Sequence, residues 1–348
     1  MNDTIWQKNL LNKLKMISSL SINNFKSIER QNLDIRPLTI LTGLNSTGKS
    51  TCFQTILTAL YYSANVVPVW MDNMDFTFET LRNRNVNAKS LEIKIVCGDG
   101  EICCFMDSDN MKSSNATNLE LEKNLFYLSA NRLGFSDFET VSLKHKVGIA
   151  GEYVFGTFDF EKSHPVDKGL IMLNDSETLS SHLNYWLSYI LGIKFEMQTE
   201  KINPTKVKVV YKSDDLSNLA PQQLGVGVSY LVKTLIMCLR SKRGDVLMIE
   251  NPELHLHPAA QARMADFFAY IVNGGIQVLL ETHCEHLIDK LQYLIYKNIL
   301  KNDQAVVYYK GGITEPFETI CFTETGKFNK SFPVGFFDAT LNELLEIE

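Results

Sequence analysis

Residues 43–51 read Gly-Leu-Asn-Ser-Thr-Gly-Lys-Ser-Thr and match the phosphate-binding pattern Gly-x-x-x-x-Gly-Lys-Ser. The apolar run 38–41 before them predicts a buried strand, and residues 52–60 after them have the periodicity of a helix. In that context the glycines let backbone N–H groups turn toward phosphate oxygens at the positive end of a helix. The stretch therefore predicts a nucleoside triphosphate site rather than a chance glycine-rich turn.

The loop assigns roles by position. Lys49 is expected to reach the β- and γ-phosphates, and the Ser50 hydroxyl is expected to ligate Mg²⁺. The predicted contacts to the nucleotide are Asn45, Ser46, Thr47, Gly48, Lys49, Ser50 and Thr51.

The composition is that of a globular α/β protein without a global basic field. The 348 residues are 45% hydrophobic and 21% charged, with a net charge of −6. Seven cysteines form no Cys-x-x-Cys pair, which is typical of reduced thiols in the cytoplasm. No apolar run approaches the ~20 residues that span a bilayer, and the N-terminus lacks the pattern of a signal peptide. We therefore expect a cytoplasmic protein without a membrane partner.

Periodicity outlines the rest of the chain. Residues 4–15 predict an amphipathic helix that docks on the protein or on a neighbouring subunit, with a membrane surface as the alternative. Residues 91–106 predict a hairpin, and the polar segment 107–122 a mobile loop. A helix is expected over 177–191, capped by Asp175 or Ser176. A parallel α/β alternation then follows: helices at 229–240, 259–271 and 286–296, and strands at 246–249 and 277–280.

The strand near residue 246 ends in an acid. Residues 246–249 form an apolar run that ends at Glu250, as expected of a Walker B strand that brings a carboxylate beside Mg²⁺. The following residues, 251–258, read Asn-Pro-Glu-Leu-His-Leu-His-Pro. We therefore predict Ser50 and Glu250 as the metal-site residues.

A family resemblance rests on four segments. Residues 250–258 resemble the Walker B segment of ABC-type ATPases of the SMC, RecF and OLD (overcoming lysogenization defect) kind. Residues 21–28 are similar to their first strands, 281–284 to their switch-histidine segment, and 224–229 occupy the place of the ABC signature. The tail 332–338 resembles that of a subgroup of stand-alone bacterial ATPases that carry a C-terminal domain of unknown function.

The resemblance implies an α/β fold: an ABC-type ATPase head, with a P-loop sheet, an antiparallel β subdomain and a helical insertion. It also implies a division of the chain into five parts. These are the helix 1–15, a first half of the head at 16–135, the insertion at 136–222, a second half of the head at 223–300, and C-terminal strands and tail at 301–348.

The same resemblance implies that two subunits sandwich two ATP molecules, as a dimer or a higher oligomer. Gly227 and Ser229 would contact the γ-phosphate bound to the other subunit, although a glycine-rich helix start without a ligand is the alternative. Tyr230 stands where related sequences often have Gln.

The group that activates water is left open. Many ABC-type ATPases have Glu where this chain has Asn251, which cannot accept a proton as a carboxylate does. Either Glu250 serves the metal and Glu253 positions water, or hydrolysis is slow and binding is the signal. His283 is expected to sense the γ-phosphate, with a histidine that caps the core as the alternative.

The histidines and Arg132 each have more than one explanation. The histidines around 255 and 283 suggest zinc, but the resemblance explains them without a metal. Arg132 resembles an arginine of the subgroup, and a surface ion pair explains it almost as well.

The sequence shows neither a nuclease domain nor a long heptad segment. The leading hypothesis is therefore an ATPase whose dimer senses or controls a separately encoded effector in bacterial anti-phage defence. One alternative is a DNA-maintenance ATPase of RecF character, with nucleic acid as partner, and another is a nucleotide-binding scaffold with negligible turnover.

Overall fold

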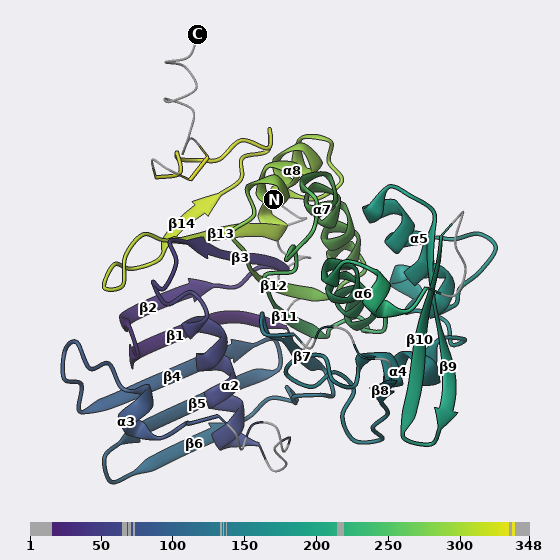
Figure 1. Ribbon diagram of the computed structural model, residues 1–348. Helices are drawn as coiled ribbons and strands as arrows, with labels where there is room; N and C mark the ends of the chain where they lie inside the picture. The colour runs from purple at the N-terminus through teal and green to yellow at the C-terminus, as the bar shows by residue number, and fades with distance from the viewer. Residues whose placement is uncertain are drawn as a thin grey trace.

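The apolar run before the loop becomes β3 (Leu38–Gly43), which is buried along its whole length inside a six-stranded sheet (Figure 1). The computed structural model describes residues 16–64, 68, 71, 74–132, 134, 136, 138–213, 219–333 and 336–337. The helix predicted over 1–15 and part of the tail 332–338 lie outside these residues.

The central sheet has the order β14-β13-β3-β12-β11-β7. All its pairs are parallel except β13–β14. The strands besides β3 are β7 (Leu125–Leu128), β11 (Val246–Glu250), β12 (Gln277–Glu281), β13 (Ala305–Lys310) and β14 (Glu318–Cys321). Because the carboxyl ends of parallel strands meet at one edge, the segments that follow β3, β12, β11 and β7 converge there.

One face of the central sheet packs on α2 (Thr51–Ser63) and on an antiparallel sheet of order β2-β1-β4-β5-β6. Its strands are β1 (Ile17–Phe25), β2 (Ile28–Asp34), β4 (Ser90–Cys97), β5 (Gly100–Asp107) and β6 (Met111–Asn115), and a short α3 (Phe78–Leu81) follows α2. Apolar side chains alternate along β4 and β5, so one face of this sheet is buried in a core that includes Phe53 and Ile56 of α2.

The other face is covered by α6 (Val226–Leu239), α7 (Pro258–Asn273) and α8 (Glu285–Tyr296), as Figure 1 shows. Beside them lies the insertion, with a three-stranded sheet of order β8-β10-β9. The insertion comprises β8 (Phe138–Thr140), α4 (Val154–Glu161), α5 (Leu179–Leu191), β9 (Phe195–Asn203) and β10 (Lys206–Ser213). Short 3-10 turns lie at Lys168–Leu170, Pro221–Gln223 and Asn302–Gln304.

The predicted α/β class, the hairpin 91–106 and the alternation after 229 are confirmed, but three local predictions are wrong. The segment 107–122 is not all loop, because β6 pairs with β5 at its start. The cap of α5 is Thr178, whose hydroxyl accepts from the N–H of Ser181. Helix α6 begins at Val226, so Ser229 lies within its first turn.

Among the described residues, no helix combines the length and the apolar content that a membrane crossing needs.

Candidate nucleotide-binding site

The phosphate loop joins β3 to α2 at the carboxyl edge of the sheet. Its first glycine, Gly43, has φ +132° and lies so close to β13 that a Cβ there would be 2.1 Å from the Lys310 carbonyl oxygen. Gly48 has φ +100°, and a Cβ on it would be 2.2 Å from the Ser27 hydroxyl oxygen. Both positions therefore require glycine, and the turn between β1 and β2, which contains Ser27, touches the loop directly.

The residues predicted to contact the nucleotide differ in how exposed they are. Asn45 and Ser46 are exposed, whereas Thr47 and Thr51 are buried. The Lys49 ammonium donates to the carbonyl of Leu44 at 2.6 Å, which places its charge inside the curve of the loop. Burial lowers the pKa of Lys49, although the charge of Glu281 opposes that effect.

Two acids end adjacent strands beside this loop. Glu281 ends β12 and Glu250 ends β11, and the two are paired in register. Glu281 is 6% exposed, and its Oε1 accepts a hydrogen bond from the Ser50 hydroxyl at 2.9 Å. Burial and the neighbouring Glu250 raise the pKa of Glu281 to about 7.

The carboxylate of Glu250 is bound on both oxygens. Its Oε1 accepts from the Tyr127 hydroxyl at 2.8 Å, and its Oε2 accepts from the N–H of Ala130 at 2.9 Å. The Tyr127 phenol comes from β7, the edge strand beside β11. Glu250 therefore takes its hydrogen bonds from the β7 side, whereas Glu281 takes its bond from the phosphate loop.

Glu253 connects the Walker B segment to the switch segment. Its Oε1 accepts from the Thr282 hydroxyl at 2.7 Å and from the N–H of His283 at 3.3 Å. Its Oε2 is buried without a hydrogen-bond partner, and burial raises the pKa of this carboxyl. The predicted residues Glu253 and His283 are thus brought together.

The His283 side chain is exposed, so it can reach a ligand at the surface of the loop. Partial desolvation, and then the charge of Lys49, lower its pKa. A neutral imidazole still has one N–H, which can donate a hydrogen bond to a phosphate oxygen.

Asn251 is held in an unusual backbone conformation. Its φ is +42°, a region that Asn tolerates better than most residues. Its N–H donates to the Glu281 carbonyl at 2.6 Å, and its own carbonyl accepts from Arg132 at 3.0 Å. Its side-chain Oδ1 is buried without a partner.

Arg132 is buried, so the alternative explanation that it forms an ion pair on the surface is wrong. It is 4% exposed and donates to the carbonyls of Glu250 and Asn251. Its guanidinium also lies 5.7 Å from the centre of the Tyr230 ring. Burial lowers the pKa of Arg132 to about 10, which leaves it charged at neutral pH. Arg132 thus fixes the backbone at the end of β11.

The signature segment packs against the Walker B segment. A Cβ on Gly227 would be 2.5 Å from the His255 carbonyl oxygen, and the Tyr230 hydroxyl donates to the Arg132 carbonyl at 3.1 Å. Ser229 is only 3% exposed, whereas Gly225 is exposed with open space beside it. The free surface at the start of α6 therefore belongs to the backbone around Gly225 rather than to the Ser229 hydroxyl.

The residues fit a magnesium–nucleotide ligand. At the ends of β11 and β12, the buried acceptors Glu281 Oε2, Glu253 Oε2 and Asn251 Oδ1 have no hydrogen-bond partner among the described residues. Within the described ranges, no three His, Cys, Asp or Glu side chains form a ready-made metal cage. Mg²⁺ does not need one, since it is usually bound by one or two protein groups together with phosphates and waters. Ser50 and an acid beside it would suffice.

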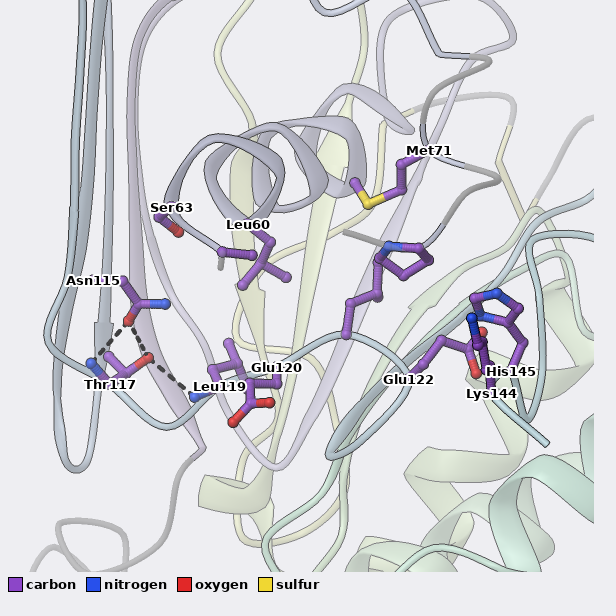
Figure 2. A pocket seen from close by; sticks show the side chains of 13 residues that line it. Leu60, Ser63, Met71, Asn115, Thr117, Leu119, Glu120, Glu122, Lys144 and His145 are labelled. Carbon is purple, nitrogen blue, oxygen red and sulfur yellow. Dashed lines mark hydrogen bonds between the residues drawn. The ribbon is translucent and has the colours of Figure 1, made fainter. Parts of the chain in front are cut away.

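A separate cavity of 610 Å³ lies at the other end of α2, about 20 Å from the loop along the helix axis. Figure 2 shows Leu60 and Ser63 on one side of it, and Glu122, Lys144 and His145 on another. None of the described residues that line it belongs to the predicted nucleotide contacts.

Comparisons with known proteins agree with this geometry. A family model described as an AAA domain matches residues 19–125, and one described as an AAA ATPase domain matches residues 174–288. Comparison with curated proteins gave no match.

Solved structures with the same fold include SMC heads. The Smc head bound to the C-terminal winged-helix domain of ScpA has a TM-score of 0.51 at 13% identity, and the match covers 88% of this chain and 97% of that chain. The Smc head with an extended coiled coil, bound to the C-terminal domain of ScpA and derived from Pyrococcus furiosus, has a TM-score of 0.51 at 10% identity. That match covers 95% of this chain and 99% of the other.

The phosphate loop, the sheet and the two family matches define a P-loop ATPase. Over these two segments the chain is similar to AAA-type ATPases, and its fold is that of an SMC head.

Sequence reasoning missed three contributors to the site: Tyr127, Glu281 and the inward position of Arg132. Glu281 carried a detectable signal, because it directly follows the predicted strand 277–280 and begins the switch-histidine segment 281–284. Tyr127 carried none, since nothing local to β7 indicates that its hydroxyl meets Glu250.

Proposed function

We propose that this protein binds and hydrolyses ATP with Mg²⁺ as a nucleotide-dependent dimer, and that this cycle controls a separately encoded partner protein. The observation that supports it best is the convergence at one sheet edge of the phosphate loop, the acids that end β11 and β12, and the switch histidine.

The residues divide the chemistry among them. Lys49 would neutralise charge on the β- and γ-phosphates, and Ser50 would ligate Mg²⁺, which supplies further charge neutralisation when bound. Glu253 would orient the attacking water, since its Oε2 is buried and has no partner. His283 would hydrogen-bond to the γ-phosphate from the exposed side.

The dimer is proposed from the start of α6. A helix of this length exposes unpaired N–H groups near Gly225, and the helix dipole favours an anion there. The family resemblance implies that a γ-phosphate at the start of α6 belongs to a nucleotide held by the phosphate loop of a second copy. The partner protein is proposed because both SMC heads are seen with ScpA bound.

Phosphate release by the wild type beside Lys49→Ala tests the enzyme. A large loss in the variant, with an unchanged circular dichroism spectrum, is expected; equal rates would reject hydrolysis at this site. Size measurement with and without ATP tests the dimer, and a strictly monomeric ATP-bound protein would contradict it.

The biological role has its own test. We place the protein in bacterial anti-phage defence, on the resemblance alone. Phage plating on cells that carry the wild type or Lys49→Ala should differ, and equal plating for all phages tried would reject the assignment. If duplex DNA instead stimulates hydrolysis in a salt-sensitive way, the DNA-maintenance alternative is favoured.

A further inference from the structure

We infer that Glu281, at the end of β12, is the carboxylate that orients Ser50 and the water molecules around the Mg²⁺ ion that Ser50 would bind. The sequence pattern assigns this role to Glu250. This inference rests on the proposed function, because it concerns how the same site holds Mg²⁺ with ATP.

The first argument is the hydrogen bond between Ser50 and Glu281. The Ser50 hydroxyl donates a hydrogen bond to Glu281 Oε1, with 2.9 Å between the two oxygens. A hydroxyl that donates to a carboxylate is oriented with its lone pairs free for a cation. Glu281 is therefore the group that sets the direction of the predicted serine ligand.

The second argument is the position of the strands. Strand β12 lies between β3 and β11, and Glu281 is level with Leu41 on one side and Glu250 on the other. Adjacent strands are about 4.8 Å apart. Glu281 therefore starts one strand closer to the phosphate loop than Glu250 does.

The third argument is the number of hydrogen-bond donors that each of the two carboxylates, Glu250 and Glu281, receives. Both oxygens of Glu250 accept hydrogen bonds, from Tyr127 and from the backbone of Ala130. In Glu281 only Oε1 accepts a hydrogen bond. Its Oε2 has no partner, and because the residue is only 6% exposed, bulk water does not replace one. A buried acceptor without a donor is costly, and a metal-bound water would satisfy it.

The neighbours of Glu281 point to the same ligand. Asn251 Oδ1 and Glu253 Oε2 are also buried acceptors without donors, on the segment that follows β11. The backbone bond from Asn251 to the Glu281 carbonyl keeps that segment against the end of β12. A hydrated cation offers several donors at once, whereas a further acceptor would add repulsion.

The test is the effect of Mg²⁺ on nucleotide affinity, measured with a fluorescent ATP analogue in EDTA and in Mg²⁺. In Glu281→Gln we expect the Mg²⁺-dependent gain in affinity to fall at least about 10-fold, the range seen when groups that orient metal ligands are removed. Affinity in EDTA should stay within about threefold of wild type. Glu250→Gln should keep most of the gain, and Glu200→Gln, an exposed acid on β9, serves as the matched control.

A double-variant cycle sharpens the test. If Glu281 acts through Ser50, then Ser50→Ala combined with Glu281→Gln should lose no more of the gain than Ser50→Ala alone. Electron paramagnetic resonance of Mn²⁺ with ATP gives an independent readout, since Glu281→Gln should weaken Mn²⁺ retention. Glu281→Asp, which keeps the charge but shortens the side chain, covers the case in which the Gln variant does not fold.

The outcomes are distinguishable. If wild type binds no nucleotide, the proposed function fails. If wild type shows a Mg²⁺-dependent gain that Glu281→Gln retains and Glu250→Gln abolishes, the proposed function stands and this inference is overturned.

Discussion

Asn251 lies where many related ATPases have a glutamate, and the structure predicts that restoring the acid will be harmful. The backbone φ of +42° suits Asn, and a longer side chain there costs about 1 kcal/mol. The new carboxylate would join Glu250, Glu253 and Glu281 at one sheet edge. Like-charge neighbours shift a carboxyl pKa by on the order of two units, or about 3 kcal/mol. We expect Asn251→Glu to lose about 4 kcal/mol of unfolding free energy at pH 8 in EDTA.

Two further variants separate these contributions. Asn251→Gln lengthens the side chain without a charge and should lose about 1 kcal/mol at any pH. Asn251→Asp adds the charge without the longer chain and should lose about 3 kcal/mol at pH 8. A carboxyl whose pKa is raised in the folded state destabilises the protein as pH rises above the unfolded pKa, so about half of the Asp penalty should disappear at pH 5.

Urea unfolding at the two pH values measures these differences, and phosphate release measures the activity. None of the three variants should exceed the wild-type rate. If Asn251→Glu accelerates hydrolysis and leaves stability unchanged, a carboxylate at position 251 can act in catalysis. The claim that its repulsion by the neighbouring acids destabilises the fold is then refuted.

Three other predictions concern the frame of the site. Arg132→Met should lose about 1–3 kcal/mol of unfolding free energy, because two carbonyls at the end of β11 lose a charged donor; Arg132→Lys should recover less than half, and an unchanged urea midpoint would contradict this. Burial raises the pKa of Glu139, so stability should decline as pH rises from about 4.5 through that raised pKa; Glu139→Gln should flatten this decline, and parallel profiles would count against it. Gly43→Ala should abolish nucleotide binding and destabilise the fold by about 3 kcal/mol or more, because its Cβ would overlap the Lys310 carbonyl; Gly225→Ala, with open space around it, should change stability by less than about 0.5 kcal/mol.

The sequence predicted the frame of the fold because local signals agreed with each other there. The strand before the loop, the helix after it and the β–α alternation from 246 to 296 all combine periodicity with turn residues. The failures occur where burial does not follow from the local pattern. Strand β6 is polar and almost wholly exposed at the edge of its sheet, so it reads as a loop.

The sequence named most residues of the candidate site but not the direction in which their side chains point. Glu250 and Glu281 both end buried strands, and the motif gives the metal role to Glu250. Its carboxylate instead meets a phenol and a backbone N–H that lie 123 and 120 residues away in sequence. Only the folded arrangement brings these donors to Glu250, and it leaves Ser50 to Glu281.

The same contacts join helix α6 to the sheet edge that carries the candidate site. Tyr230, in the first turns of α6, donates to the carbonyl of Arg132, and the Arg132 guanidinium donates to the carbonyls of Glu250 and Asn251. Asn251 in turn donates to the carbonyl of Glu281, whose side chain accepts from Ser50. Each link is a direct hydrogen bond, so the start of α6 cannot move far from the phosphate loop without breaking at least one. In the dimer proposed above, a second subunit that contacts α6 would press on a structure already tied by hydrogen bonds to Glu250, Glu281 and Ser50.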